Sequence, residues 1–514
     1  QMCIRDSFLP YRANRHLIGL SSREALVSEG EGTTYRALNA KANRLSHGLL
    51  RLGLEKGDKV GTLFANSPEL VVTYFAVLKA GGVLVPLNPR LRAEELFYMM
   101  DHSEAKYLVF SERFLKVVTS IQDRLPGLKL AIFCGKVTPG NAVSYHDLIE
   151  QGSEGEPDIE VCEDDGFAIV YTAGTTGTPK GVLLTHRNFI WGMLNQNTSY
   201  HLPPDRSLQV FPLAHSAGLI GLCTRMMRGD TIVLIRGADL ELILDTIQRE
   251  QITFLGLVPT LSNALSQAPS LDRYDRGSVR LVGSGAAILP PETKKRLSYL
   301  FPNAEFFDTY GMTECSGPIT TLGPKDFFRK KACVGKGFPY HEVRVVNEEG
   351  DDVKVGEVGE IIVSGPTIMA GYYKNPKETK ETLRNGYLFT GDLARLDEEG
   401  FVYIVDRKKD IIISGGYNVY PKEIEDVLFT HPKVAEAAVI GIPDKKWGET
   451  IRAVVVPRKH QEITENEIID FCKDRLASYK KPTSVLFVDA LPKSPVGKVL
   501  KRVLRQEGQK GDAK

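Results

Sequence analysis

The chain has 514 residues, of which 42% are hydrophobic and 25% charged, and its formal net charge at pH 7 is +1. This composition is that of a soluble globular protein, and the length exceeds what one hydrophobic core can organise, so two or more domains are expected. The near-zero net charge excludes a global attraction to nucleic acid or to an anionic membrane surface.

The cysteines and the chain ends bear on the cellular compartment. The seven cysteines are scattered and form no CxxC pair and no Cys/His cluster, which argues against a zinc site and against a disulfide framework. No apolar run reaches the roughly 18 residues of a membrane-spanning helix, and the N-terminal stretch lacks the apolar segment of a signal peptide. Residues 1–7 are expected to lie outside the fold, and the polar tail carries no peroxisomal signal. We therefore expect a cytoplasmic protein.

Helical and strand-like segments alternate through the N-terminal two thirds of the chain. Residues 34–52 have the apolar spacing of an amphipathic helix, with Gly53 as its stop. Residues 68–79 predict a second helix between strands at 60–66 and 83–88. Further strand-like runs begin at Tyr107, Leu130, Ser207, Thr231, Ile252 and Arg280. This alternation predicts parallel βαβ layers.

The pattern changes twice toward the C-terminus. After Gly335, residues 342–365 predict strands joined by acidic, glycine-rich turns, as in an antiparallel or barrel-like unit. From Asp406, a charged run precedes alternating helices and strands of a compact α+β unit. We therefore expect an α/β protein in which a large N-terminal domain (8–405) combines βαβ layers with a barrel-like subdomain. A smaller α+β C-terminal domain (406–514) follows it.

The segment YTAGTTGTPKG, residues 171–181, has the composition of a phosphate-binding loop. It follows a strand-like run (167–172), and the apolar run that starts at Val182 predicts a helix. Glycines let backbone N–H groups approach an anion, hydroxyls donate hydrogen bonds, and Lys180 supplies a positive charge. It is not a Walker A loop, because Pro179 precedes the lysine and Gly181 follows it. Alone, the segment is equally compatible with an ordinary surface loop.

Four later segments combine glycine, hydroxyl and charged residues: GSGAAILP (283–290), DTYGMTE (308–314), YLFTGD (387–392) and PKSPVGK (492–498). They offer small residues against which a flat ring can lie, an aromatic ring, and carboxylates that suit a hard cation or ribose hydroxyls. Each also has a simpler explanation. Asp392 can be a turn residue, Lys498 a surface lysine, and Glu314 a carboxylate near a helix N-terminus.

Taken together, the motifs YTAGTTGTPKG, YGMTE, TGD, DRKKDIIISGGYN and PKSPVGK resemble those of the adenylate-forming superfamily of acyl-CoA synthetases, nonribosomal adenylation domains and luciferases. They occur in that family's order and separations, and the likeness extends from about Thr33 to Arg505. The resemblance implies that a carboxylate and MgATP give an acyl-adenylate and pyrophosphate, and that a thiol then displaces AMP. The implied cofactors are ATP, Mg²⁺ and coenzyme A.

The resemblance also implies roles for individual residues. The nucleotide contacts are Thr172, Ala173, Gly174, Thr175, Thr176, Gly177, Lys180, Gly285, Ala286, Asp308, Thr309, Tyr310, Gly311, Thr313, Asp392, Arg407 and Lys498. Thr175 and Glu314 would hold Mg²⁺, Tyr310 would stack on adenine, and Lys498 would act with Glu314 in catalysis of the first step. The pantetheine arm of CoA would run close to the backbone of Ser414, Gly415 and Gly416. A mobile C-terminal domain would rotate about a hinge at Lys409. Ala173 departs from the family, because many members carry Ser there.

The identity of the acid depends on residues 211–228, FPLAHSAGLIGLCTRMMR. Amino-acid-activating members place an Asp in this stretch, which has neither Asp nor Glu here, so a free amino acid is not expected. His215, Ser216 and Gly218 would line the acyl site, although His215 could equally be a core residue. Gly218 and Gly221 are expected to leave room for an apolar tail. A dicarboxylic acid would require an arginine in the acyl site, but the sequence does not show which face of the helix Arg225 or Arg228 occupies.

We therefore expect an AMP-forming acid–CoA ligase for a medium- or long-chain fatty acid, with an aryl or cyclic carboxylate as the alternative. The expected partners are small molecules and not nucleic acid, and a homodimer is left open. Two other classes remain: a luciferase-like or carrier-loading adenylating enzyme, and a catalytically silent nucleotide-binding protein. CoA-dependent release of AMP separates a CoA ligase from a luciferase-like or carrier-loading enzyme. Carboxylate-dependent release of pyrophosphate excludes a catalytically silent protein.

Overall fold

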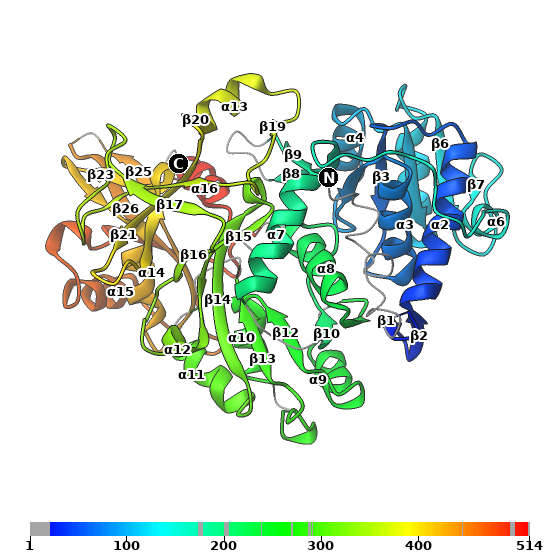
Figure 1. Ribbon diagram of the computed structural model, residues 1–514. Coiled ribbons are helices and arrows are strands. Elements are labelled where there is room, and N and C mark those ends of the chain that lie inside the picture. The colour runs from blue at the N-terminus through cyan, green and yellow to red at the C-terminus, as the bar shows by residue number, and fades with distance from the viewer. Residues whose placement is uncertain are drawn as a thin grey trace. The chain divides into compact units, whose positions relative to one another are not determined.

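The computed structural model describes residues 21–511 except 173–177, 200–204, 238, 269–270, 286–288, 290, 445 and 494–498 (Figure 1). The chain divides into two compact units. The first consists of residues 1–342 and 363–388, and the second of residues 343–362 and 389–514. The expected boundary at residue 406 stays a prediction. None of the helices in the described residues combines the length and the hydropathy that crossing a bilayer requires.

The first unit contains an eight-stranded sheet in the order β19-β9-β8-β4-β3-β5-β6-β7. Its strands are β3 (Lys59–Leu63), β4 (Val83–Leu87), β5 (Tyr107–Ser111), β6 (Leu130–Cys134), β7 (Val143–Ser144), β8 (Gly166–Thr172), β9 (Lys180–Thr185) and β19 (Gly371–Tyr372). The strands from β8 through β4, β3, β5 and β6 to β7 pair in parallel. The helices connected with them are α2 (Tyr35–Arg51), α3 (Pro68–Lys79), α4 (Ala93–His102), α5 (Leu115–Gln122) and α6 (Tyr145–Glu150). The predicted βαβ layer is therefore present.

Local signals set the first two of these helices. The Thr34 hydroxyl caps α2 by accepting a hydrogen bond from the backbone N–H of Ala37 at 3.2 Å. The Ser67 hydroxyl caps α3 in the same way, and Pro68 occupies the first helical position, where its missing N–H costs nothing. Both helices begin within one residue of the position that the sequence predicts, because capping is a contact between near neighbours in the chain.

The segment after the phosphate loop differs from the prediction. The apolar run from Val182 is not a helix but the body of β9, which pairs antiparallel with β8 through Tyr171 and Gly181. The helix α7 begins only at His186 and ends at Ser199. A short apolar run has no periodicity that separates a buried strand from a helix, so here pairing with β8 decided the conformation. The predicted phosphate loop therefore joins two strands that pair antiparallel.

The second sheet of the first unit has nine strands in the order β16-β15-β14-β13-β12-β10-β11-β1-β2. They are β1 (Glu24–Ser28), β2 (Glu31–Thr34), β10 (Arg206–Gln209), β11 (Thr231–Leu234), β12 (Phe254–Leu257), β13 (Leu281–Ser284), β14 (Glu305–Met312), β15 (Gly317–Leu322) and β16 (Lys336–Gly337). Its helices are α8 (Ser216–Arg228), α9 (Leu240–Arg249), α10 (Pro259–Leu265), α11 (Pro291–Leu300) and α12 (Pro324–Phe327). The strands from β11 through β10, β12 and β13 to β14 run parallel, so their carboxyl ends meet at one edge. Helices α7 and α8 pack against each other (Figure 1).

The second unit contains two smaller sheets. The first is formed chiefly by β17 (Glu342–Val346), β18 (Gly359–Ser364), β21 (Tyr387–Leu396) and β22 (Val402–Arg407). The second has the order β24-β23-β26-β25, with β27 beside β26, and its strands are β23 (Ile412–Ser414), β24 (Tyr417–Val419), β25 (Val434–Asp444), β26 (Gly448–Pro457) and β27 (Ser484–Phe487). Its helices are α14 (Pro421–Phe429), α15 (Glu465–Lys473) and α16 (Lys501–Gly511). The expected α/β class, with a large N-terminal and a smaller C-terminal part, is confirmed.

Candidate active site

Two of the predicted nucleotide motifs follow neighbouring parallel strands. Gly285 comes directly after β13, and the motif 308–314 forms the end of β14 and the 3₁₀ turn after it (Thr313–Cys315). In open α/β sheets, ligands bind outside the carboxyl ends of the strands. Segments that lie more than twenty positions apart in the sequence are therefore brought to one sheet edge. Ala286 lies outside the described residues.

Close backbone approach explains two glycines at this edge. A Cβ atom at Gly285 would lie 2.7 Å from Thr309 Oγ1, and that hydroxyl donates a hydrogen bond of 3.0 Å to the carbonyl of Ser284. A Cβ atom at Gly311 would lie 2.1 Å from the carbonyl oxygen of Gly317, where β14 meets β15. Both positions therefore disfavour any side chain larger than that of glycine.

The Asp308 side chain points into the protein interior. It is 2% exposed, and burial raises the pKa of this carboxyl to about 6, an effect that the charge of Lys294 partly offsets. One of its oxygens accepts a hydrogen bond of 3.0 Å from the backbone N–H of Thr309. This hydrogen bond fixes the backbone that presents Thr309 and Tyr310, and the contact of Asp308 with the nucleotide stays a prediction.

Thr313 and Glu314 face two different elements. The hydroxyls of Thr313 and Ser216 lie 3.0 Å apart, which joins the turn after β14 to the first residue of α8. Glu314 is 8% exposed, and its carboxylate accepts a hydrogen bond of 2.9 Å from the Tyr372 hydroxyl. Tyr372 was not predicted, because nothing in its local sequence distinguishes it from a structural tyrosine.

The donor set suits Mg²⁺. The described residues contain no group of three His, Cys, Asp or Glu side chains that could hold a metal ion. Mg²⁺, however, is bound through one or two carboxylates and completes its shell with substrate phosphates and water. Glu314 supplies one such carboxylate, and one of its oxygens has Tyr372 as partner. The other predicted ligand, Thr175, lies outside the described residues.

Lys180 and Thr172 close the two ends of the phosphate loop. They are opposite each other in the β8–β9 pair, so the backbone holds the loop ends together. The Lys180 ammonium forms an ion pair with Glu378 at the start of α13 (Pro376–Thr382) and lies 5.3 Å from the centre of the Tyr372 ring. A pocket of about 330 Å³ opens beside this pair. Residues Ala173, Gly174, Thr175, Thr176 and Gly177 lie outside the described part of the chain.

The three predicted acyl-site residues lie around the start of α8. His215 is the residue before the helix, and the amide of Asn88 lies 2.8 Å from its Nε2 atom. Burial, and to a lesser degree the charge of Arg90, lowers the pKa of His215 to about 4, so the ring is neutral at pH 7. Gly218 does not leave the expected room, because a Cβ atom there would lie 2.1 Å from the Pro212 carbonyl oxygen. Its role is close packing of the helix on the preceding backbone.

Asp392 and Arg407 form a pair within the second unit. They are opposite each other in β21 and β22, and Arg407 Nε lies 2.8 Å from an Asp392 carboxylate oxygen. The Asp392 side chain is 7% exposed, whereas that of Arg407 is 44% exposed. Both residues were expected to contact the nucleotide, and the strand pairing makes them neighbours. Neighbouring Lys408 is tied to Glu360 by an ion pair of 3.0 Å.

Lys409 lies in the short turn Lys408–Asp410 that follows β22. The residues on both sides of it are anchored within the second unit, since Lys408 pairs with Glu360 and Asp410 pairs with Arg505 at 3.0 Å. Lys409 itself is exposed. Lys498, the other residue on which the two-step hypothesis depends, lies outside the described residues.

The SGGY segment is a β-hairpin turn. Gly415 and Gly416 connect β23 to β24, and their φ values of +58° and +82° are those that a two-residue hairpin turn requires. The backbone N–H of Gly415 donates a hydrogen bond of 2.8 Å to the carbonyl of Trp447, whereas the space beside Gly416 is open. Trp447 is 50% exposed, and Tyr417 beside the turn is 60% exposed. Neither aromatic residue was predicted: Tyr417 lies on β24, where an aromatic side chain usually packs in the core, and Trp447 lies in the turn before β26.

Comparisons with known proteins agree with this arrangement. The family model of AMP-binding enzymes matches residues 18–373, and that of the AMP-binding enzyme C-terminal domain matches residues 423–498. A feruloyl-CoA synthase of Amycolatopsis sp is 36% identical over 479 residues, which are 93% of this chain and 94% of that protein. A long-chain-fatty-acid–CoA ligase of Mycobacterium tuberculosis is 36% identical over 476 residues, which are 92% of this chain and 93% of that protein. The crystal structure of ATP-bound MatB from Rhodopseudomonas palustris is similar with a TM-score of 0.87 and 34% identity, and the match covers 95% of this chain and 96% of that one.

These matches span nearly the whole chain and confirm the resemblance that the ordered motifs indicated. They also confirm ATP, Mg²⁺ and coenzyme A as the cofactors of the reaction. The relatives activate acids of different kinds, aromatic and aliphatic, so the family alone leaves the acid open. The chain belongs to the AMP-binding enzyme family and is an AMP-forming acid–CoA ligase.

Proposed function

We propose that this acid–CoA ligase activates a carboxylic acid with an apolar, aliphatic or aromatic body, which lies along α8 from its first turn. One observation carries the proposal: residues 211–228, all of them described, include no carboxylate that could hold a substrate ammonium. The charge state of His215 supports it, since burial keeps this imidazole neutral. The contact between Ser216 and Thr313 supports a position for the reacting carboxylate near the start of α8.

The residues of the first unit would hold the nucleotide. We propose that Lys180 and Thr172 orient the outer phosphates, that Thr313 contacts the α-phosphate, and that adenine lies between Tyr310 and the Gly285 backbone. When bound, Mg²⁺ would neutralise charge that develops on the phosphates, and Glu314 would hold it. Glu314 is kept in place by Tyr372, which is a positioning residue in this scheme. Attack on the α-phosphorus is then assisted by orientation and charge and needs no covalent intermediate with the protein.

The second unit would supply the ribose and thiol contacts. We propose that Asp392, with Arg407, accepts hydrogen bonds from the ribose hydroxyls, and that Lys498 assists the first half-reaction. The open space beside Gly416 supports a path for the pantetheine arm. The nucleotide end of CoA would be bound by the exposed indole of Trp447 and by the ammonium of Lys446, which lies 4.7 Å from the centre of the indole ring.

Pyrophosphate release with a matched panel of acids tests the proposal. Phenylalanine and 3-phenylpropanoate differ only in the α-amino group, so they isolate the missing ammonium site. We expect turnover with 3-phenylpropanoate, and with hexanoate to palmitate or benzoates, to exceed that with phenylalanine. Equal or faster turnover of the amino acid would contradict the proposal. Thioester formation that depends on free CoA, without light or a carrier protein, separates the ligase from a luciferase-like or carrier-loading enzyme.

A further inference from the structure

The Arg225 guanidinium is a buried cation that has no carboxylate partner in the described part of the chain. Arg225 lies on α8 and is 7% exposed. Among the described residues, its hydrogen-bond partner is the neutral side-chain amide of Gln209, and its guanidinium lies 4.8 Å from the centre of the Phe254 ring. Burial lowers the pKa of Arg225 to about 10, which leaves the side chain charged at pH 7. A buried charge is costly unless it is paired, so this arrangement needs an explanation.

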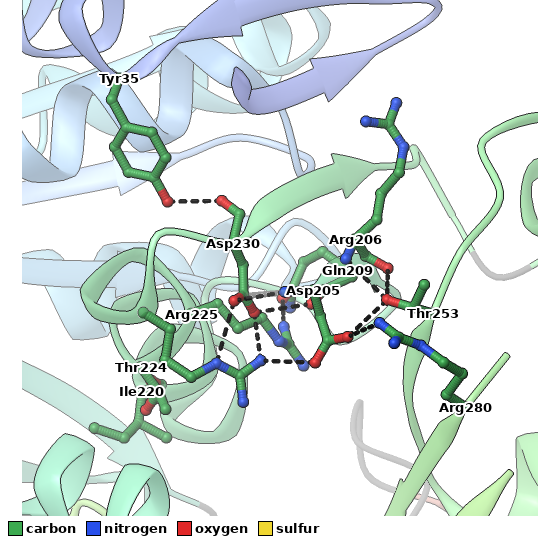
Figure 2. Close-up of polar contacts among 12 residues, drawn as sticks. Tyr35, Asp205, Arg206, Gln209, Ile220, Thr224, Arg225, Asp230, Thr253 and Arg280 are labelled. Carbon is green, nitrogen blue, oxygen red and sulfur yellow. Dashed lines mark hydrogen bonds and ion pairs between the residues drawn. The ribbon is translucent and has the colours of Figure 1, made fainter. Parts of the chain in front are cut away.

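The two acidic residues whose charges act on Arg225, Asp230 and Asp205, are already paired with other cations (Figure 2). Asp230 accepts two contacts from Arg228, at 3.2 and 2.5 Å. Asp205 accepts from Arg280 at 3.0 Å and from the Thr253 hydroxyl at 2.9 Å. The two carboxylates are therefore matched by two other arginines. These carboxylates act on Arg225 only through long-range electrostatic attraction. The hydrogen bond that the Arg225 guanidinium donates goes to the amide oxygen of Gln209.

Two glycines place the guanidinium against bare backbone. A Cβ atom at Gly221 would lie 3.6 Å from one terminal nitrogen of Arg225, and a Cβ atom at Gly256 would lie 3.5 Å from the other. The space that Gly221 leaves is therefore filled by Arg225 and not by an apolar tail, contrary to the expectation from the sequence. Gly221 follows Ser216 by five residues, which is about 7.5 Å along the helix axis. The cation thus lies roughly that far from the start of α8.

We propose that Arg225 is a specificity-determining residue that binds a second carboxylate at the far end of the acid, so that the substrate is a dicarboxylic acid with a short apolar spacer. This inference rests on the proposed function, which places the reacting carboxylate at the start of α8. A carboxylate accepts two parallel hydrogen bonds from a guanidinium and neutralises it, which Gln209 does not do. A long alkyl tail would instead meet a charge that it cannot solvate. Of the acids expected from the sequence, a long-chain fatty acid is therefore disfavoured.

Matched pairs of acids that differ only at the far end test this inference. Pyrophosphate release would be measured with pimelate against heptanoate, and with terephthalate against 4-methylbenzoate. We expect kcat/KM to favour the diacid of at least one pair. Arg225→Met should lower that diacid-to-monoacid ratio by about 100-fold or more, because a site built for a polar group discriminates strongly against its absence. Arg225→Lys should retain part of the preference.

Arg228→Met is the matched control, because Arg228 lies one turn further along α8 and pairs with Asp230. It should lower stability and leave the ratio unchanged. Since the ratio compares two acids on one preparation, it does not depend on the fraction of folded protein. A wild-type preference for the monoacids, or an unchanged ratio in Arg225→Met, would overturn the inference while the ligase function stands. Absence of pyrophosphate release with every acid would instead overturn the proposed function, and this inference with it.

Discussion

Replacing Lys180 by alanine should weaken the use of MgATP through two separate effects. The ammonium faces the pocket beside the phosphate loop, and its side chain is 12% exposed. A hydrogen bond to a charged group contributes about 1.5–3 kcal/mol, which corresponds to a roughly 10- to 100-fold rise in the KM for MgATP. The substitution also leaves the Glu378 carboxylate, 29% exposed, without its partner and close to the incoming phosphates. Like charges repel, so the loss should lie toward the upper end of this range.

The second effect can be isolated with Glu378. In a Lys180→Ala/Glu378→Gln double variant the repulsion is removed, so the KM should recover several-fold relative to the Lys180→Ala single variant. Glu378→Gln alone should lower the KM, because the phosphates no longer compete with a carboxylate for Lys180. The assay is the MgATP dependence of pyrophosphate release at a saturating concentration of acid, with a melting curve for each variant. An unchanged KM in Lys180→Ala, with both single variants equally destabilised, would show that the pair only ties α13 to β9.

The remaining predictions concern the second unit and the pH dependence of stability. Lys409→Pro should leave pyrophosphate release largely intact and slow thioester formation, because a hinge residue needs a φ angle that is free to change. Lys498→Ala should abolish the first step, whereas the variant should still convert a supplied acyl-adenylate to the thioester. Equal loss of both steps in both folded variants would contradict domain rotation. Trp447→Ala should raise the KM for CoA without changing pyrophosphate release, and an unchanged KM for CoA would remove its proposed role. Burial lowers the pKa of His186 from 6.5 to about 3, so the free energy of unfolding should fall as the pH drops below 6.5. His186→Gln should make the free energy of unfolding, measured by denaturant titration, depend less on pH. An equally steep pH dependence in this variant would mean that other groups cause it.

Much of the molecule could be predicted from the sequence, because the signals involved are local. The caps Thr34 and Ser67 act within three residues of the helices that they start. The order of the motifs along the chain identified the family and its reaction, since each motif keeps its chemistry in a short segment. Asp392 and Arg407 were each predicted to contact the nucleotide, and the structure adds the strand register that makes them neighbours.

The rest was decided by contacts between distant segments. The run after Val182 became a strand because β8 offered it a partner, and no pattern inside the run specifies that pairing. Glu378 reaches Lys180 from 198 positions away, and Tyr372 reaches Glu314 from 58. Arg225 is one of two arginines in α8 that look equivalent in the sequence, yet among the residues that the structure describes only Arg228 is paired with acids. The sequence by itself therefore determined the fold class and the reaction. Only the tertiary structure decided which charges are buried and which have partners, because burial and pairing are properties of the packed chain.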